Sequence, residues 1–369
     1  MRLVIDGQRL SAHRTGVGRL LEGLLDEWST TGWPLDEVVL VVRDPAGLVR
    51  VPESPGLTPL LVGSRWPGLA WETFGLRGQL RRDDLLFAPA NLVPWNWHGA
   101  TVLIVHDTLL WSMPESFPWY ARFRFGWRYR LAVRRATRII VPSQSTARDV
   151  ARVHAVPEAS LRVIYPGPEP RFRPLSPASS EVATARRAVG LGEGSFFLFV
   201  GKRSRRRHVP AILLAFAQHQ ARWPDHRLVF VGPSGGAVIP RSDPRVIDAG
   251  HVSERVLHGL FAGALGLLYP SDYEGFGLPV LEAMACGCPV VTLRNSALTE
   301  SAGDAAYYLD GPEPVAIRRA MESLATDAAL RAHLAARGIE HAAKFSRAAF
   351  GQGVKEEIRR VAGAWDRRV

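Results

Sequence analysis

One stretch of the sequence decides the fold class, and it reads Glu274-Gly275-Phe276-Gly277-Leu278-Pro279-Val280-Leu281-Glu282-Ala283-Met284-Ala285-Cys286-Gly287-Cys288-Pro289-Val290. It follows a short apolar run, Leu267 to Tyr269, that predicts a strand, and it opens a helix at about Gly277. Val290-Val291 then predicts the next strand. A strand, a glycine loop, a helix and a second strand form the unit from which parallel sheets are built.

The same alternation of short apolar runs and helical patterns continues along the chain in both directions. At the start, Leu3 to Ile5 predicts a strand, a loop with Gly7 and Gly16 follows, and Val17 to Trp28 carries apolar residues at helical spacing. Further strands are expected at Val38 to Val42, Leu85 to Phe87, Val102 to Val105, Ile139 to Val141, Val163-Ile164, Phe196 to Val200 and Leu228 to Val231. The first six strands should form one sheet. The fold class is therefore α/β, with helices on both faces of parallel sheets.

A proline-rich segment divides the chain. From Tyr165 to Pro177 the proline density is higher than a helix or a central strand tolerates. We expect a first domain at 1–172, a second at 178–345, and a last helix at 346–369 that returns to the first domain. The length of 369 residues agrees with two domains. Two Rossmann-like domains would face a central cleft, because open α/β sheets bind ligands at the carboxyl ends of their strands.

The composition is that of a globular protein, with 47% hydrophobic and 22% charged residues, and it excludes a disordered or collagen-like chain. The net charge is +11, but only three of the 46 basic residues are lysines. A GC-rich coding sequence produces such an excess of arginine. We therefore give the basic charge little weight as a sign of nucleic-acid binding, and we expect no nucleic-acid partner.

The two cysteines and the chain start carry little functional signal. Cys286 and Cys288 are one residue apart in an apolar segment, which suits neither a zinc site nor a disulfide that closes a useful loop, so we expect buried reduced thiols. The apolar run after Met1 is too short for a signal peptide, and no stretch approaches the roughly 18 apolar residues that span a bilayer. We expect a cytoplasmic protein.

The quoted stretch also carries the strongest chemical signal. Its glycines let the backbone approach a ligand, and free N–H groups at the helix start can receive a phosphate or sugar oxygen. Glu274 in the loop and Glu282 in the helix could hold two hydroxyl-rich rings. The loop residues that would line such a site are Gly275, Phe276, Gly277 and Leu278.

The stretch resembles the motif E-G-F-G-L-P-x-x-E-A-M-A-x-G-x-P-V of the large retaining glycosyltransferase family of GT-B fold that is often called family 4, or glycosyl transferases group 1. Weaker resemblances follow in the expected order at Thr15 to Arg19, His106-Asp107, Val141 to Ser145, Ser296 to Glu300 and Gly303 to Ala306. Thr299 stands where the family usually has proline. The resemblance covers most of the chain.

The resemblance implies a hexosyltransferase that moves a sugar from a nucleotide diphosphate donor to an acceptor hydroxyl, with retention at the anomeric carbon, no metal and no cofactor. Glu274 would bind sugar hydroxyls and Glu282 the nucleoside ribose. His106, at the end of a strand, would bind the transferred sugar or the incoming hydroxyl. Asp107 would orient His106 or its loop. The glycines that would approach the donor diphosphate at the first helix start are Gly16 and Gly18.

A cationic loop from Lys202 to His208 follows the strand at Phe196 to Val200. A departing nucleoside diphosphate gains negative charge, which must be offset by fixed cations where no metal is bound. We expect Lys202 and Arg207 to supply that charge, helped by Arg206. The family usually has arginine at the position of Lys202 and lysine at the position of Arg207, so this chain has the two residues interchanged. The remaining arginines, which we expect to be surplus and exposed, are Arg203 and Arg205.

The sequence shows no obvious ligands for a metal ion that could neutralise the charge of the diphosphate. Some enzymes of this chemistry hold a divalent ion with an Asp-x-Asp pair, and none occurs here. Asp83-Asp84 precedes a strand, which is the wrong end of a parallel sheet for substrate.

The segment from Trp119 to Arg138 interleaves aromatic rings with arginines. Tyr120, Phe123, Trp127 and Leu131 would form one stripe on a helix. One interpretation is an interfacial patch that gives peripheral contact with the inner membrane face or a lipid-linked acceptor. The other is a core-facing stripe with an exposed arginine face.

Two rival functions remain at this point. A nucleotide-sugar epimerase of the same architecture would isomerise the donor instead of transferring its sugar. A basic nucleic-acid-binding module is disfavoured because the cations gather beside phosphate-type loops. GDP-mannose and UDP-hexoses are both admissible donors, and the acceptor could be a cell-envelope glycan, a lipid-linked compound or a small molecule.

Overall fold

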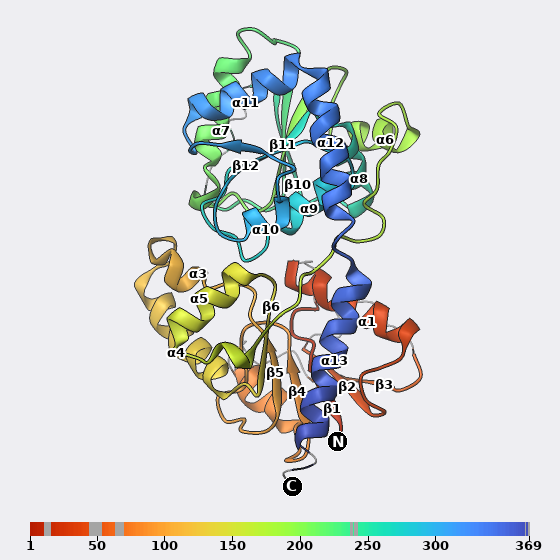
Figure 1. Cartoon of the computed structure of the whole chain (residues 1–369), viewed down its shortest axis with the longest axis vertical. Coiled ribbons are helices and arrows are strands. Elements are labelled where there is room, and N and C mark those ends of the chain that lie inside the picture. Colours follow the sequence, from red (N-terminus) through yellow and green to blue (C-terminus); the bar gives the residue numbers. More distant parts are fainter. Residues whose placement is uncertain are drawn as a thin grey trace. The chain divides into compact units, whose positions relative to one another are not determined.

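The computed structural model describes residues 1–10, 16–43, 54–62, 70–236, 239, 243–365 and 367. The chain divides into two compact units. The first combines Met1–Pro166 with Arg347–Val369, and the second is Gly167–Ser346 (Figure 1). Thr15, which belongs to the expected first glycine loop, lies outside the described residues.

The first unit is built on a parallel sheet with strand order β3-β2-β1-β4-β5-β6-β7. Its strands are β1 (Leu3–Asp6), β2 (Val38–Val42), β3 (Leu57–Leu61), β4 (Leu85–Ala88), β5 (Thr101–Ile104), β6 (Arg138–Val141) and β7 (Leu161–Val163). This is one strand more than the six expected. The sequence pattern missed β3 because Pro59 argues against a strand, but the edge position of β3 tolerates a residue without an N–H donor.

Alternate residues of each strand face two different cores. Leu3 and Ile5 pack into the core formed with α1 (Gly16–Thr31) and α13 (Arg347–Trp365), whereas Val4 packs into the core on the other face. The helices and short helical turns that complete this unit are η2 (Trp71–Leu76), α3 (Leu109–Ser112), η3 (Pro114–Ser116), α4 (Trp119–Arg135), α5 (Gln144–His154) and η4 (Glu158–Ser160).

The last helix, α13, is part of the first unit although it follows the whole of the second unit in sequence. Figure 1 shows it, in dark blue, lying along α1. Phe350, Val354 and Ile358 are buried in the same core as Trp28, and the Trp28 indole donates to the Gly351 carbonyl at 3.0 Å. The first core is therefore completed by the C-terminal residues.

The second unit repeats the design, with parallel strand order β10-β9-β8-β11-β12-β13. The strands are β8 (Phe196–Val200), β9 (Arg227–Val231), β10 (Val246–Gly250), β11 (Gly266–Tyr269), β12 (Val290–Leu293) and β13 (Tyr307–Leu309). The helices are α6 (Ser180–Ala188), η5 (Arg205–Arg207), α7 (Val209–His219), α8 (Glu254–Gly263), α9 (Leu278–Ala285), α10 (Leu298–Ala302), α11 (Pro314–Thr326) and α12 (Ala328–Ala342).

Both sheets have the doubly wound order 3-2-1-4-5-6 in their own numbering, with β7 as an addition to the first. The expected α/β class with two Rossmann-like domains is confirmed. No helix among the described residues is both long enough and apolar enough to span a bilayer.

The boundary between the units falls after Pro166, six residues before the expected domain end at 172. Phe172 is buried and packs edge-on against Phe261, with ring centroids 5.8 Å apart, so it belongs to the second unit. His258 Nε2 donates a 2.7 Å hydrogen bond to the Arg173 carbonyl and fixes the same segment. Since a carbonyl only accepts, the imidazole is the donor.

Candidate active site

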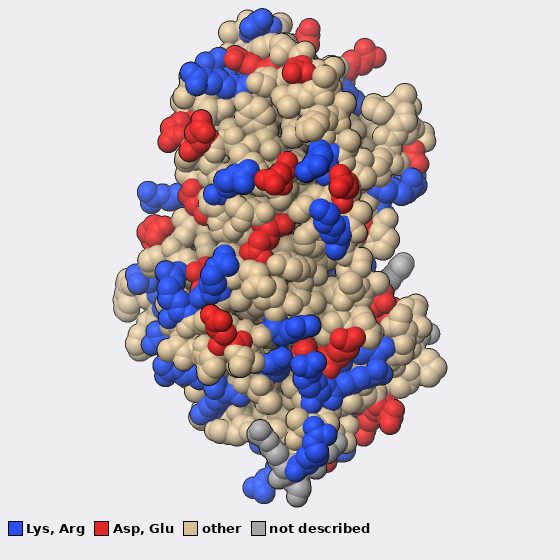
Figure 2. All heavy atoms as spheres, viewed as in Figure 1, with Lys and Arg blue, Asp and Glu red and all other residues tan. Residues whose placement is uncertain are grey.

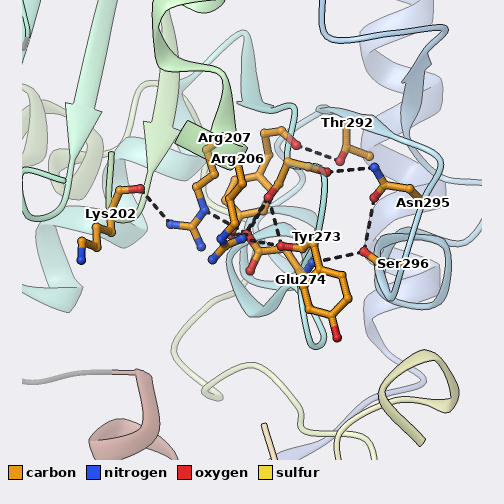
Figure 3. Close-up of polar contacts among 10 residues, drawn as sticks. Lys202, Arg206, Arg207, Tyr273, Glu274, Thr292, Asn295 and Ser296 are labelled. Carbon is orange, nitrogen blue, oxygen red and sulfur yellow. Dashed lines mark hydrogen bonds and ion pairs between the residues drawn. The ribbon is translucent and has the colours of Figure 1, made fainter. Parts of the chain in front are cut away.

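The candidate site lies in the second unit, at the point where the strand order of its sheet reverses. That reversal falls between β8 and β11, and the loops that follow these two strands meet at the carboxyl edge of the sheet. The first loop contains Lys202, Arg206 and Arg207, and the second contains Glu274. Figure 3 shows that the structure brings these sequence-predicted residues together.

The Glu274 carboxylate is the centre of the cluster. Its Oε1 atom accepts hydrogen bonds at 2.9 Å from Arg207 Nε, the Tyr269 hydroxyl and the Ser271 hydroxyl, and it also accepts one from Arg206. Within the described residues, Oε2 of Glu274 receives no hydrogen bond. The hydrogen bonds that fix the Glu274 carboxylate therefore all fall on one of its two oxygens.

The electrostatics fix the protonation state of this cluster. Burial alone would raise the pKa of Glu274, but the charges and hydrogen bonds of Arg207 and Arg206 outweigh it and lower the pKa to about 2. Burial opposes the charge on Arg207, and Tyr269 and Glu274 overcome that effect and raise its pKa. At neutral pH the carboxylate is ionised and can only accept hydrogen bonds.

Arg207 links the two loops. Its Nη1 atom donates to the Lys202 carbonyl at 3.2 Å, and its guanidinium lies 5.1 Å from the centre of the Tyr269 ring. Gly201 makes this approach possible, because a Cβ there would lie 2.2 Å from Arg207 Nη1 and its φ is +126°. In the described part of the chain, Nη2 of Arg207 donates to no other group.

Lys202 and Arg206 have different roles in the cluster. Arg206 donates to the Tyr273 carbonyl and, at 3.0 Å, to the Ser271 hydroxyl, so it holds the glutamate loop in place. The Lys202 side chain is exposed and extends away from Glu274 in Figure 3. Its ammonium makes no ion pair with the described residues.

The expectation for Arg203 was wrong. Arg203 is 5% exposed and pairs with Asp248 of β10 at 2.6 Å, so it is neither surplus nor on the surface. The sequence pattern could not show this because β10 itself was not recognised. Arg205 is exposed, as expected.

Helix α9 begins directly after the glutamate loop. Gly277 precedes it with φ of +104°, and a Cβ there would lie 2.9 Å from the Ser301 hydroxyl, so glycine is required at this turn. Glu282 lies on α9 and is 1% exposed.

The remaining loop residues differ in exposure. Gly275 and Leu278 are half-buried. The Phe276 ring is buried and packs against Phe345, with ring centroids 5.7 Å apart, so this side chain supports the loop by packing.

Sequence reasoning missed several residues that shape the glutamate loop. Tyr269 and Ser271 donate to Glu274, and the Glu274 N–H lies 3.1 Å from the Ser296 hydroxyl, to which it donates. The Asn295 side chain donates to the Ser271 carbonyl at 3.1 Å. Tyr269 ends β11, and the other residues follow β11 or β12. This position is the signal that could have identified them, since strand carboxyl ends meet at one edge.

In the first unit, the expected residues His106 and Asp107 follow β5. His106 Nε2 lies 2.6 Å from the Pro89 carbonyl, which only accepts, so the ring donates there and Nδ1 carries the lone pair. Burial lowers the pKa of His106, although Pro89 and Asp107 partly oppose that effect. Asp107 accepts a 3.0 Å hydrogen bond from the Leu109 N–H and thereby orients the loop.

The expected glycines lie at the start of α1. Gly16 is exposed and is the first residue of the helix, and a Cβ there would meet no heavy atom of the described residues within 4 Å. Gly18 is the third residue of the same helix and is buried.

The cysteines are buried thiols, and Asp84 forms an ion pair within the protein. Cys286 and Cys288 are free buried thiols, as expected, and burial raises the pKa of Cys288 to about 12. Asp84 is 1% exposed and pairs with Arg2 at 2.7 Å. In the described ranges, no group of three or more His, Cys, Asp or Glu residues could hold a metal ion.

Comparisons with known proteins identify the family of this chain with two parallel-sheet domains. The family model described as Glycosyl transferases group 1 matches residues 182–341, and the model described as Glycosyltransferase Family 4 matches residues 14–171. Together the two models cover most of the chain. The chain belongs to the family 4-like glycosyltransferases of GT-B fold.

Several curated relatives and solved structures resemble this chain. O-antigen chain mannosyltransferase B of Escherichia coli is 28% identical over 278 residues, which is 72% of this chain and 71% of that protein. D-inositol 3-phosphate glycosyltransferase of Acidothermus cellulolyticus is 30% identical over 57% of this chain and 50% of its own length. The structure of Anabaena HepE in complex with UDP and glucose covers 97% of this chain and 99% of its own, with TM-score 0.73 and 18% identity. WaaG, involved in lipopolysaccharide biosynthesis, covers 96% and 99%, with TM-score 0.73 and 16% identity.

Proposed function

We propose that this glycosyltransferase moves a hexose from GDP-mannose or a UDP-hexose to an acceptor hydroxyl, with retention at the anomeric carbon and without a metal. The acceptor is a glycan, a lipid-linked compound or a small molecule. The observation that carries the proposal is the cluster of Glu274 with Arg206 and Arg207 at the switch point of the second sheet. The mannosyltransferase relative and the UDP-glucose complex of HepE support the choice of donors.

The charge of the cluster suits a diphosphate. Arg206 and Arg207 together outweigh Glu274 by one positive charge, and Lys202 adds a second. The diphosphate of a nucleotide sugar carries about two negative charges, and the leaving group gains more as the bond to the sugar breaks. Lys202 Nζ and Arg207 Nη2 would donate to its oxygens, helped by Arg206, whose hydrogen bonds within the described residues all use Nη1.

Glu274 serves as an acceptor of sugar hydroxyls. Its Oε1 atom is held by four donors, so Oε2 is fixed in position while it remains available. Because its pKa is lowered to about 2, Glu274 cannot act as a general acid at neutral pH, and it is a weak nucleophile. That favours a front-face route in which the leaving phosphate helps to deprotonate the acceptor. Glu282 would then bind the ribose.

His106 completes the proposal from the first unit. Its Nε2–H is used by the Pro89 carbonyl, so Nδ1 can accept a hydrogen bond from a hydroxyl of the sugar or of the acceptor. The lowered pKa keeps the ring neutral, as an acceptor must be.

The test replaces Lys202 by methionine, because its ammonium is exposed and makes no ion pair with the described residues. Loss of one charge-assisted hydrogen bond costs about 1.5 to 3 kcal/mol, so release of GDP or UDP from the donor should slow about 10- to 150-fold. Lys344→Met, at another exposed lysine of this unit, is the matched control and should leave the rate unchanged. EDTA should also leave it unchanged.

The opposite pattern would overturn the metal-free mechanism: EDTA abolishes turnover, manganese restores it, and Lys202→Met is fully active. A thermal-shift panel of GDP and UDP identifies the base, because a bound nucleotide raises the melting temperature. The anomeric coupling constant of the product, measured by NMR, decides between retention and inversion.

A further inference from the structure

Helix α4 presents large aromatic side chains to solvent. Trp119 is 78% exposed, Phe123 76%, Tyr120 61% and Trp127 46%. The buried residues of the helix are a different set: Arg128, Tyr129, Ala132 and Val133. The stripe in the sequence therefore does not face the core, and the interpretation of it as a core-facing stripe is wrong.

The same helix is strongly basic. Six arginines and no acidic residue lie on it, and no acidic residue occurs between Glu115 and Asp149. Arg128 is buried and paired with Glu72 of η2. The other five arginines are exposed: Arg122, Arg124, Arg130, Arg134 and Arg135. Figure 2 shows Lys and Arg gathered on the side of this unit where Figure 1 places α4.

A groove of about 360 Å³ runs beside these rings, between the start of α4 and the short elements α3 and η3. Its walls are mostly apolar, and the residues that line it are Leu110, Trp111, Pro114, Trp119, Arg122 and Phe123. Exposed rings, arginines and an apolar groove thus occur on one surface.

We propose that this α4 surface, defined by Trp119, Tyr120, Arg122, Phe123 and Arg124, docks onto a bilayer that contains anionic phospholipids. Aromatic side chains lie favourably at the boundary between headgroups and acyl chains, and exposed arginines are attracted to the negative surface. The positive charge and the exposed rings together favour binding of the α4 surface to an anionic bilayer.

The geometry favours a lipid surface over a single-stranded nucleic acid. Nucleic-acid bases stack on flat aromatic platforms inside a basic groove. Here the exposed rings project from a helix, and Trp119 meets Tyr120 edge-on, with 83° between the ring planes. Such rings can enter a headgroup layer but do not form a stacking platform.

The docking surface is joined directly to the loop that carries His106. The Tyr129 hydroxyl of α4 donates to the Asp107 carbonyl, and α3 begins at Leu109. Membrane docking of α4 would therefore hold the His106 loop close to the lipid surface. This inference goes beyond the proposed function and does not depend on it.

The test is co-sedimentation of the full chain with vesicles of phosphatidylcholine alone or with about 30% phosphatidylglycerol, at physiological salt. The wild type should bind the anionic vesicles and only weakly the neutral ones. Each arginine near the surface contributes about fivefold to binding, so Arg122→Gln/Arg124→Gln should weaken it about 25-fold. Arg255→Gln/Arg319→Gln, at two exposed arginines of the second unit, is the matched control and should bind like the wild type.

A second pair of variants tests the aromatic rings independently of the charge. Trp119→Ala/Phe123→Ala should weaken vesicle binding about tenfold, whereas Leu214→Ala, at a leucine that is 51% exposed in the second unit, should not. All these positions are exposed, so melting temperatures should match the wild type. Three results would overturn the proposal: equal binding to neutral and anionic vesicles, equal loss in the control variants, or tighter binding to a single-stranded oligonucleotide than to the vesicles.

Discussion

Replacing Glu274 by alanine should lower the stability of the second unit, whatever its effect on catalysis. Arg206 and Arg207 have side chains only 14% and 10% exposed, and both are paired with the Glu274 carboxylate. Without that carboxylate, both guanidinium groups lose the acidic partner that they have among the described residues. Tyr269 and Ser271 lose their acceptor at the same time.

The expected cost follows from two separate arguments. Breaking a buried ion pair by removing one partner costs about 3 to 5 kcal/mol. Independently, the pKa of Glu274 falls from 4.5 to about 2 on folding, and a shift of that size corresponds to about 3 kcal/mol. Because the folded pKa is the lower one, this stability is present above pH 4.5 and is lost as the pH falls toward 2. For a unit of this size, about 3 to 5 kcal/mol lowers the melting temperature by about 6 to 20 °C.

The assay is thermal unfolding at pH 7, followed by calorimetry so that the transitions of the two units can be separated. The matched control is Glu322→Ala, which removes a carboxylate paired with Arg318 where both side chains are more than a quarter exposed. That pair should contribute at most about 1 kcal/mol. Glu274→Gln, which keeps the shape and one acceptor oxygen, should fall between the two. If Glu274→Ala melted within about 2 °C of Glu322→Ala, the buried pair would not stabilise the fold by several kcal/mol.

Two further predictions concern the first unit. His154 is 1% exposed, neither ring nitrogen has a hydrogen-bond partner among the described residues, and burial and nearby arginines lower its pKa from 6.5 to about 4. The unfolded chain therefore binds a proton at His154 more readily than the folded protein, and the free energy of unfolding falls by about 2 kcal/mol between pH 7 and pH 5. In denaturant titrations, His154→Leu should remove that loss. An unchanged dependence of stability on pH in this range would contradict the prediction. Arg128→Ala should lower the free energy of unfolding by about 3 to 5 kcal/mol, because it leaves Glu72 buried and unpaired. The double variant Arg128→Met/Glu72→Leu removes both charges and should have nearly the stability of the wild type. Equal losses of stability in the two variants would contradict a stabilising role of the pair.

The sequence was sufficient to predict the core of the fold and the centre of the site. Central strands such as β8 and β11 are continuous apolar runs, so their position and parallel pairing follow from the pattern alone. Since the loops after two neighbouring central strands meet, Arg206, Arg207 and Glu274 could be expected together.

The features that the sequence did not reveal lie at the edges of the sheets. β3 contains Pro59, β10 contains an aspartate and a glycine, and β13 has only three residues, so none shows a continuous apolar pattern. The burial of Arg203 could not be anticipated for the same reason, because its partner Asp248 lies on β10. Hydrogen bonds from Tyr269 and Ser271 depend on loop geometry, which no periodicity encodes.

The order of the two cations in the loop after β8 has a physical reason in this structure. Arg207 spans from the Glu274 carboxylate to the Lys202 carbonyl, using Nε for one and Nη1 for the other. A lysine at 207 has a single ammonium group and could not hold both groups in this fixed geometry. Position 202 has no such task, since the Lys202 side chain is exposed and, among the described residues, Lys202 contacts the cluster through its backbone carbonyl. Arginine therefore stands where the two loops must be joined, and lysine stands where the charge is exposed, which is the position that the proposed function assigns to the donor phosphate.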